Sequence, residues 1–328
     1  MKVLLTGATG FLGSYIAEQL AAAGHSVRAL VRASSDTRRL EALPGAERVV
    51  GTVEDAASVA RAMEGMESVI HAAGILKGLG PEDFERVNVG GTANVLEAAR
   101  RTAGFRRLVF VSSIAAVGPS VDGRPVSADH PPAPVTHYGR SKLKAEALLK
   151  AAAGEVPSTI IRPPMVYGPR DRETLAFFKS VKSGVMPFVG GGRNTLSVIY
   201  VEDCARACVQ ALTASGVESG TAFFVEDGQV YVWREMLEEL ERALGRKALL
   251  RFSVPVSVLT AVALGNEAVA KMTGKPAMLT RDKLNELLAP HWVFDGKPAQ
   301  KALGWKPEVA WAEGVRRAAA WYRAEGWL

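Results

Sequence analysis

The chain has 328 residues, of which 48% are hydrophobic, and its 40 Lys and Arg outnumber 34 Asp and Glu to give a net charge of +6. This length and apolar content exclude a disordered chain and suit one large domain or two closely joined ones. The basic residues are scattered and are not interleaved with aromatic ones, so we expect no nucleic-acid partner and instead an attraction for anionic cofactors or substrates.

The N-terminal segment predicts a strand, a glycine-rich turn and a helix. An apolar run at 2–5 leads into residues 6–13 (TGATGFLG), after which a helical pattern begins. Gly7, Gly10 and Gly13 allow a sharp turn, close approach of a pyrophosphate and tight packing of helix on strand, although such a turn can also be purely structural. Because this segment does not resemble a signal peptide, we expect a cytoplasmic protein.

A second strand is predicted at 25–32, and its carboxyl end bears Arg32 where an acidic residue is common. In dinucleotide-binding folds an acidic side chain here holds the ribose hydroxyls of NAD. A guanidinium suits the 2′-phosphate of NADP instead, with Ser34 and Ser35 as hydroxyl donors. The alternative interpretation is a solvated arginine on a loop.

Strand and helix patterns continue to alternate, which predicts a doubly wound α/β fold with a parallel sheet covered on both faces. Small residues at 72–74 stand at the carboxyl end of one strand, where ligands bind in such sheets. His71, inside the apolar part of that strand, is expected to be a packed core residue. The predicted strands are 47–51 and 67–74, and the predicted helices are 55–63 and 89–102.

A fifth strand at 107–113 ends in two serines, and a long loop rich in Gly, Pro and Asp precedes a helix that runs from about 136 to 149. Tyr138 and Lys142 are four apart and project from one face of that helix. Such a pair is by itself most often a surface contact. Its position after a strand that ends in serines, in a chain that begins with a glycine turn, favours a functional interpretation.

Taken in order, these motifs resemble those of the extended short-chain dehydrogenase/reductase superfamily, the NAD(P)-dependent epimerase/dehydratase family. The resemblance extends over nearly the whole chain. The pattern is most similar to the dihydroflavonol reductase and 3β-hydroxysteroid dehydrogenase branch. The matching segments are 6–13, 71–74 (HAAG), 88–92 (NVGGT), 111–113 (VSS), 138–142 (YGRSK), 161–169 (IRPPMVYGP), 200–203 (YVED) and 303–307 (LGWKP).

The resemblance implies a Rossmann-type doubly wound parallel sheet with a smaller C-terminal substrate-binding domain. Residues 1–164 would bind the cofactor and hold the catalytic residues, and 165–328 would mainly bind the substrate, with a segment around 194–215 returning to the sheet. Family resemblance also suggests a homodimer packed through helices that include the one bearing Tyr138.

The resemblance also implies a catalytic set of Ser113, Tyr138 and Lys142. A tyrosine with a pKa near 10 needs roughly 4 kcal/mol of preferential phenolate stabilisation to act near neutral pH. The Lys142 ammonium and an oxidised nicotinamide can together supply it. Tyr138 would donate a proton to the substrate carbonyl oxygen, Ser113 would hold that oxygen, and Lys142 would also bind the nicotinamide ribose. Ser112 points to the other side of the strand and is expected to be structural.

The implied cofactor is NADP(H), with NAD(H) less favoured, and no metal is expected. Asn88 either shapes the helix behind the site or holds a relay water. Where the family often has an aspartate for the adenine amine, this chain has Thr52, so we expect a weaker adenine contact that the Val53 backbone N–H shares. The predicted cofactor-binding residues are Gly7, Thr9, Gly10, Phe11, Leu12, Gly13, Arg32, Thr52, Val53, Ala72, Ala73, Gly74, Asn88, Tyr138, Lys142, Pro163 and Val166.

Two departures from the sugar-nucleotide members of the family bear on the substrate. Those enzymes usually carry an arginine and an aspartate where this chain has Leu196 and Ser197, and an aliphatic side chain cannot pair with a diphosphate. Nearby Arg193 keeps a diphosphate substrate open. Sugar dehydratases place an acidic pair beside the catalytic hydroxyl, whereas Ile114 follows Ser113 here.

We therefore predict an NADP(H)-dependent oxidoreductase that interconverts a carbonyl and an alcohol on a small, fairly apolar substrate. The first alternative is an NAD(P)-dependent nucleotide-sugar epimerase. The second, from another functional class, is a non-catalytic NADP-sensing regulatory protein.

Apolar segments in the C-terminal half have several interpretations. The run 254–263 is too short to span a bilayer, so we expect a buried or substrate-lining helix, with membrane-surface contact as a second interpretation. The aromatic residues at 177–178 and Trp233 could line an apolar pocket, although such residues are more often core. Cys204 and Cys208 lie four apart in an apolar helical pattern and are expected to be buried rather than metal-binding.

Overall fold

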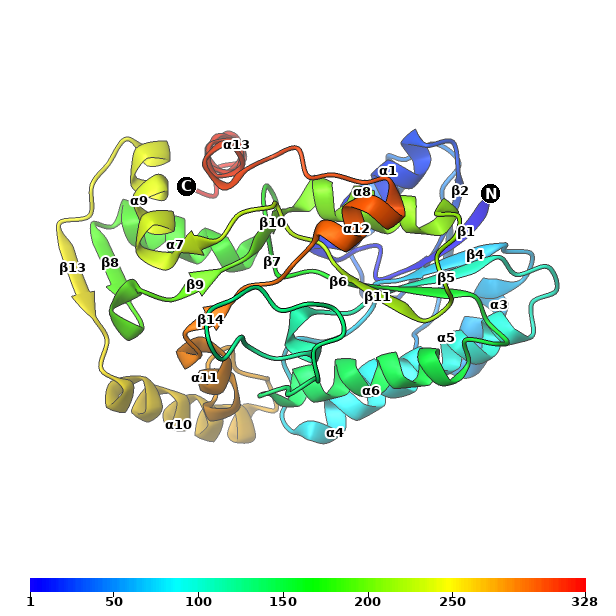
Figure 1. Cartoon of the computed structure of the whole chain (residues 1–328), viewed down its shortest axis with the longest axis horizontal. Helices are drawn as coiled ribbons and strands as arrows, with labels where there is room; N and C mark the ends of the chain where they lie inside the picture. Colours follow the sequence, from blue (N-terminus) through cyan, green and yellow to red (C-terminus); the bar gives the residue numbers. More distant parts are fainter.

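A computed structural model describes residues 1–328. The fold is built around a seven-stranded sheet in which all paired strands are parallel (Figure 1). In spatial order the strands are β3 (Glu47–Val50), β2 (Ser26–Val31), β1 (Lys2–Thr6), β4 (Ser68–His71), β5 (Arg107–Val111), β6 (Ser158–Arg162) and β11 (Thr221–Phe224). The direction of winding reverses between β1 and β4, and ligands bind beside the carboxyl ends of the strands at such a point. The predicted doubly wound α/β fold is confirmed.

Helices cover both faces of this sheet because both faces are apolar. In β1, Val3 and Leu5 pack into one core and Leu4 into the other. Distant segments share a face: a helix from beyond residue 200 packs against the first helix. One face is covered by α1 (Phe11–Ala22), α2 (Arg38–Glu41), α8 (Val201–Thr213) and α12 (Lys297–Leu303), and the other by α3 (Ala56–Met63), α4 (Pro81–Phe84), the π-helical turn η1 (Glu85–Gly90), α5 (Gly91–Arg100) and α6 (His137–Ala151).

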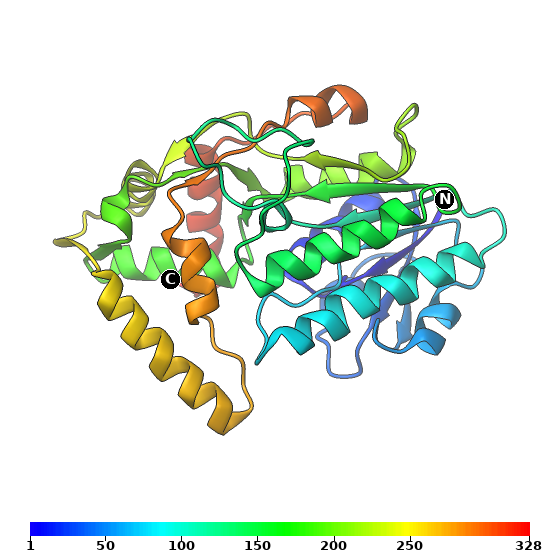
Figure 2. The same cartoon turned by 60° about the horizontal axis from the view of Figure 1, so that its bottom comes forward.

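A smaller lobe lies beyond the carboxyl ends of the sheet (Figures 1 and 2). Its core contains buried aromatic side chains, among them Tyr167, Trp311 and Tyr322. The remaining elements are the 3-10 turn η2 (Ile114–Ala116), β7 (Met165–Tyr167), α7 (Arg172–Lys182), β8 (Val185–Phe188), the 3-10 turn η3 (Gly190–Gly192), β9 (Thr195–Leu196), β10 (Val198–Tyr200), β12 (Tyr231–Val232), α9 (Trp233–Leu244), β13 (Leu250–Ser253), α10 (Val256–Thr273), α11 (Arg281–Leu288), β14 (His291–Trp292) and α13 (Trp311–Ala324).

Several predicted core residues are buried. His71 accepts or donates hydrogen bonds at both ring nitrogens, to the hydroxyls of Thr6 (2.7 Å) and Thr92 (3.1 Å). Burial lowers the pKa of His71 to about 3, so the ring is neutral. Cys204 and Cys208 are fully buried free thiols. These three residues therefore contribute to packing, as predicted.

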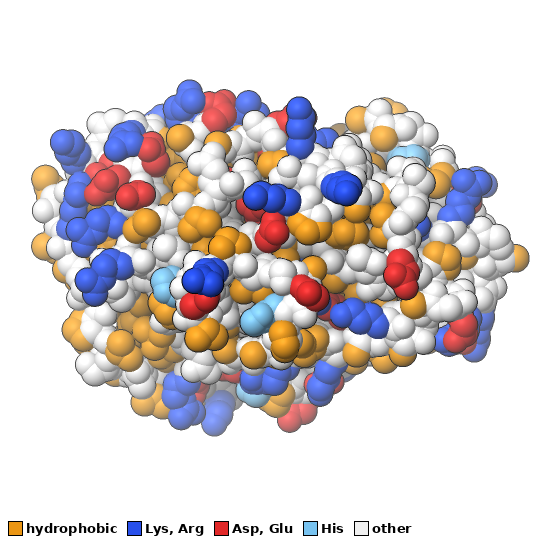
Figure 3. Space-filling model, in the orientation of Figure 1, with side chains coloured by type: hydrophobic (Ala, Val, Ile, Leu, Met, Phe, Trp, Pro, Cys, Tyr) orange, Lys and Arg blue, Asp and Glu red, His pale blue; other side chains and the backbone are white.

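The apolar run at 254–263 does form a helix, α10, but the prediction that this helix is buried is wrong. Only Ala263 and Ala270 are buried along its length, whereas Val262 is 48% and Met272 87% exposed. Apolar composition alone does not reveal whether another element covers a helix, and α10 packs mainly against α11. Figure 3 shows the resulting hydrophobic surface at the lower left of the molecule. No helix of the structure combines the length and the apolar character needed to cross a membrane.

Candidate active site

The glycine turn lies at the carboxyl end of β1, where steric contacts explain its glycines. Gly7 has φ +77°, and a Cβ there would lie 2.7 Å from backbone atoms of Ala72 and Ala73. A Cβ on Gly13 would lie only 2.0 Å from the carbonyl oxygen of Gly7. The turn is thus packed against both β4 and its own helix, and larger residues at these two positions would separate them.

The amino end of α1 has the properties of an anion site. Its N-cap residue is Gly10, so no side chain caps the helix, and no acidic residue lies in the first turn. The first N–H groups of a helix have no partner within the helix and carry partial positive charge. Thr9 and Gly10 are exposed at this end. The residues present therefore fit the pyrophosphate of a dinucleotide.

A second cluster lies where β4 ends. A Cβ on Gly74 would meet the side-chain oxygen of Asn88 at 3.0 Å and Nζ of Lys142 at 3.4 Å, so these three positions adjoin. The amide of Asn88 donates to Ser141 Oγ (2.9 Å) and to the carbonyl of Ile75 (3.1 Å), and its oxygen accepts from the Ile75 N–H (2.8 Å). Asn88 thus ties the 74–75 loop to α6, in agreement with the interpretation that it shapes the region behind the site.

Other predicted cofactor residues lie along the same edge of the sheet. Some of their polar groups are free to bind a cofactor, and others already form hydrogen bonds within the protein. Arg32 is exposed just after β2 and forms no salt bridge. Thr52 Oγ1 donates to Glu54 at 3.3 Å. Val53 is buried, and its carbonyl accepts from the Asn94 amide at 2.9 Å. The carbonyl of Pro163, after β6, accepts the Ile114 N–H at 3.1 Å, and the partly buried Val166 lies in β7.

The side chains of the adjacent residues Ser112 and Ser113 lie in different environments at the end of β5. Ser112 is buried, and its hydroxyl donates to Glu146 at 2.6 Å. Ser113 is partly exposed, and its hydroxyl oxygen accepts the Ala115 N–H at 3.1 Å at the start of η2. Strand alternation predicts this divergence, and Ser112 is structural as expected.

Helix α6, which bears Tyr138 and Lys142, begins directly beside η2. Thr136 caps its amino end by accepting the Gly139 N–H at 3.1 Å. A Cβ on Gly139 would lie 2.2 Å from the carbonyl oxygen of Ala115, so glycine allows the first turn to approach closely. This contact places the first turn of α6, which includes Tyr138, against the segment that directly follows Ser113. Burial raises the pKa of Tyr138, and the nearby Ser113 hydroxyl opposes that rise by hydrogen bonding.

Lys142 lies one helical turn after Tyr138 and is buried. Its Nζ donates to the carbonyl of Val111 at 2.8 Å and lies 4.7 Å from the ring centroid of Phe110. Burial lowers the pKa of Lys142 to about 8, against the opposing effect of the Glu146 carboxylate. In this arrangement the Lys142 ammonium is bound to the backbone of β5.

Glu146, which sequence reasoning missed, continues the spacing of Tyr138 and Lys142 by another helical turn. It is fully buried and accepts two hydrogen bonds from Arg162, at 2.9 and 2.6 Å. A buried pair of this kind is held by its hydrogen bonds, and removing one partner leaves the other charge uncompensated. The four-residue spacing was the available sequence signal.

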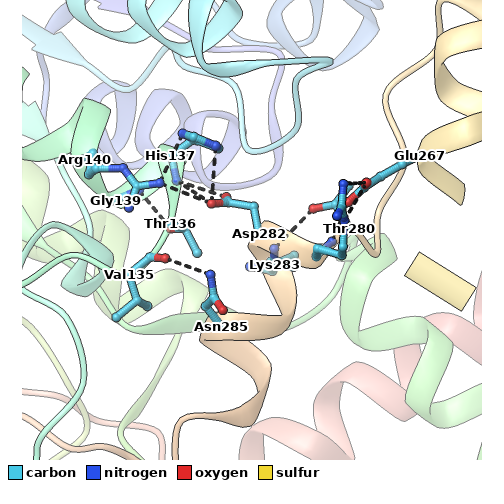
Figure 4. A network of polar contacts seen from close by, with 11 residues as sticks. Val135, Thr136, His137, Gly139, Arg140, Glu267, Thr280, Asp282, Lys283 and Asn285 are labelled. Atoms are coloured by element: carbon cyan, nitrogen blue, oxygen red, sulfur yellow. Dashed lines mark hydrogen bonds and ion pairs between the residues drawn. The ribbon is translucent and has the colours of Figure 1, made fainter. Parts of the chain in front are cut away.

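Helix α11 also contacts α6, and no motif predicted this contact. Asp282 accepts the backbone N–H of His137 with both carboxylate oxygens, at 3.2 and 3.0 Å, and Arg140 at 3.3 Å (Figure 4). Thr280 caps α11 by accepting the Lys283 N–H at 3.2 Å. The first turn of α6 is therefore held from the smaller lobe, next to Tyr138.

Together these groups can hold a phosphate-bearing dinucleotide along the sheet edge and present a phenol and a hydroxyl to an exposed reactant. Such a set suits proton transfer to or from an oxygen beside the bound dinucleotide.

Comparison with known proteins identifies the family of this chain. Residues 3–225 match the family model for the NAD dependent epimerase/dehydratase family. The chain is 33% identical over 331 residues to the ceramide reductase of Caulobacter vibrioides, which covers 99% of this chain and 96% of that protein. It is 31% identical over 340 residues to the 2-alkyl-3-oxoalkanoate reductase of Stenotrophomonas maltophilia, with coverage of 97% and 98%.

A solved structure shares the fold as well. The UDP-glucose 4-epimerase of Thermus thermophilus, in complex with NAD, has a TM-score of 0.78 and 25% identity, and the match covers 98% of this chain and 99% of that one. The chain therefore belongs to the NAD-dependent epimerase/dehydratase family of extended short-chain dehydrogenases/reductases.

Proposed function

We propose that this protein, a nicotinamide-dependent oxidoreductase by family, uses NADP(H) to interconvert a carbonyl and an alcohol on a small, fairly apolar substrate. The observation that supports the proposal most strongly is that Tyr138 and Lys142 lie one helical turn apart on α6, whose first turn packs on η2 directly after Ser113, at the edge that also holds the glycine turn. Residues 1–164 would bind the cofactor and 165–328 mainly the substrate.

The side chains have separate parts in the reduction. When bound, the cofactor supplies the hydride. The Ser113 hydroxyl donates a hydrogen bond to the carbonyl oxygen and fixes its position. Tyr138, whose pKa is raised by burial, stays protonated until it donates its proton to that oxygen. Lys142, whose ammonium donates to the Val111 carbonyl in this structure, would hold the ribose hydroxyls of the cofactor and offset the negative charge left on the phenol.

The preference for NADP rests on Arg32. Its guanidinium stands exposed at the end of β2 without a carboxylate partner, as a 2′-phosphate site requires. The acidic residue nearest in sequence, Asp36, is exposed and pairs with Arg38 at 2.5 Å.

The environment of Leu196 favours a carbonyl reductase over a nucleotide-sugar epimerase. Leu196 packs against apolar residues of two clusters, and the neighbouring Ser197 hydroxyl accepts the Phe294 N–H at 3.1 Å. Neither position offers a cation to a diphosphate. The reductase names of the two relatives, one a ceramide reductase and one an oxoalkanoate reductase, agree with a ketone on an aliphatic chain.

A substrate panel tests the proposal. Purified protein is given NADPH or NADH with aliphatic, aromatic and steroidal ketones, and cofactor absorbance is followed; a parallel reaction contains UDP-glucose. We expect NADPH oxidation with at least one ketone, and its loss in Tyr138→Phe with cofactor binding retained. Turnover of UDP-glucose without any ketone reduction would support the epimerase alternative. Equal cofactor binding with no turnover in either form would support the regulatory one.

A further inference from the structure

We propose that Glu286 belongs to the substrate site and recognises a hydrogen-bond donor that the substrate carries close to its carbonyl group. The donor is a hydroxyl, an amide N–H or an ammonium. This inference rests on the proposed function and deepens it, because it assigns one polar feature to an otherwise apolar substrate.

Helix α11 presents Glu286 toward the catalytic helix. Asp282 accepts the His137 N–H, and the Asn285 amide donates to the Val135 carbonyl at 3.3 Å, so this face of α11 lies against the start of α6 (Figure 4). Residues four apart on a helix share a face. Glu286 follows Asp282 by four residues and therefore leaves α11 on the side of α6.

Two further observations relate Glu286 to Tyr138 and to the segment after Ser113. Its negative charge contributes to the raised pKa of Tyr138, so carboxylate and phenol lie within electrostatic reach. Its main-chain carbonyl accepts the Trp292 indole N–H at 3.0 Å. Trp292 packs in one apolar cluster with Ile114, which directly follows Ser113. The backbone of Glu286 is thus tied to the apolar cluster that contains Ile114.

The two carboxylate oxygens differ in their surroundings. Lys283 Nζ donates to Oε1 at 2.5 Å, whereas Oε2 is buried and has no hydrogen-bond partner. A buried acceptor without a partner has lost its water without compensation. A donor on a bound substrate would satisfy it, and a substrate carboxylate would be repelled. The same group therefore selects for neutral or cationic substrates with a donor and against anionic ones.

The alternative role for Glu286 is a helix-surface ion pair with Lys283 and nothing more. Glu239 and Arg242 on α9 form a pair of the same spacing, and the exposed fractions of the two glutamate side chains are similar, 28% for Glu239 and 26% for Glu286. Glu239→Gln is therefore the matched control, because it removes an equivalent charge pair away from the site.

The experiment measures kcat/KM with NADPH for 2-octanone, 1-hydroxy-2-octanone and 3-oxooctanoate. The proteins are the wild type, Glu286→Gln, Glu286→Asp and Glu239→Gln, each checked by thermal unfolding. We expect the wild type to favour the hydroxyketone over 2-octanone by about tenfold, as a hydrogen bond to a charged group allows. Glu286→Gln should lose most of that ratio and reduce 3-oxooctanoate about tenfold better. Glu286→Asp should keep the preference in part, and Glu239→Gln should behave as the wild type.

Each other outcome contradicts the inference in a recognisable way. If Glu286→Gln lowers kcat/KM equally for all three ketones, the role is structural. If Glu286→Gln does not fold, the wild type and Glu286→Asp decide the question. Recognition of a donor is contradicted if the wild type reduces 2-octanone or 3-oxooctanoate better than 1-hydroxy-2-octanone and Glu286→Asp shows the same preference. If the wild type reduces none of these three ketones although the substrate panel identifies another ketone, recognition of a donor beside an aliphatic carbonyl is contradicted and the proposed function stands. If the panel identifies no ketone either, the proposed function fails and this inference fails with it.

Discussion

Replacing Gly13 by Ala tests whether the tight glycine turn is required for both stability and cofactor binding. The new Cβ would lie 2.0 Å from the Gly7 carbonyl oxygen and 2.7 Å from its carbon. Reaching even a 3.0 Å contact needs a shift of about 1 Å between α1 and β1, and overpacking of this kind costs about 1–3 kcal/mol. The N–H groups that face the pyrophosphate move with α1, so NADPH affinity should fall by at least about tenfold, since a 1 Å misplacement can cost more than that.

Urea unfolding and NADPH fluorescence titration measure the two effects. Gly265→Ala in α10 is the control, because its Cβ would meet nothing within 4 Å. A helical glycine replaced by alanine in open space gains up to about 1 kcal/mol, so this variant should be slightly more stable and should bind NADPH as the wild type does. Wild-type stability and wild-type NADPH affinity in Gly13→Ala would refute the argument.

Three other predictions concern charged groups. Arg32→Ala should raise KM for NADPH by about tenfold and leave KM for NADH unchanged, because the guanidinium contacts only the 2′-phosphate; an equal change for both cofactors would contradict this assignment. Burial lowers the pKa of Lys142 to about 8, so the ammonium loses its proton above that pH and kcat/KM for NADPH should fall above pH 8. Lys142→Arg should abolish this fall in the pH profile. A fall that persists in Lys142→Arg would assign it to another group. Arg162→Met leaves the buried Glu146 charge unpaired and should lower the free energy of unfolding, measured in urea, by about 3–5 kcal/mol. The double variant Arg162→Met/Glu146→Leu should recover part of this loss. An unchanged urea midpoint in Arg162→Met would show that the pair contributes nothing to stability.

The sequence predicted those parts of the fold that local pattern determines. The apolar run before Gly7 and the small residues around Gly74 mark strands whose ends meet at one sheet edge, because parallel strands place their carboxyl ends together. The four-residue spacing of Tyr138 and Lys142 placed both on one helix face, and the alternation at Ser112 assigned its hydroxyl to the core.

Contacts between distant segments could not be predicted in this way. Asp282 meets His137 across more than a hundred residues, and the segment around it contains no spacing that differs from an ordinary surface helix. The exposure of α10 was mispredicted for a related reason, since hydropathy at Val262 records composition and not the presence of a packing partner. The hydrogen-bond partner of Lys142 also depends on geometry, and the four-residue spacing from Tyr138 does not predict its bond to the Val111 carbonyl.

The central claim is that Tyr138 protonates the oxygen of a carbonyl group while a hydride from NADPH reaches the carbon of that group. Transfer of isotope from a labelled cofactor tests this claim most directly. Protein is mixed with NADPH deuterated at the transferable position and a ketone that the panel identifies, and the product is analysed by mass spectrometry. We predict an alcohol with deuterium on the former carbonyl carbon. Tyr138→Phe should bind NADPH normally but form product at least about a hundredfold more slowly, the usual effect of losing a general acid. Equal rates in the two proteins, or an alcohol without deuterium, would contradict the account.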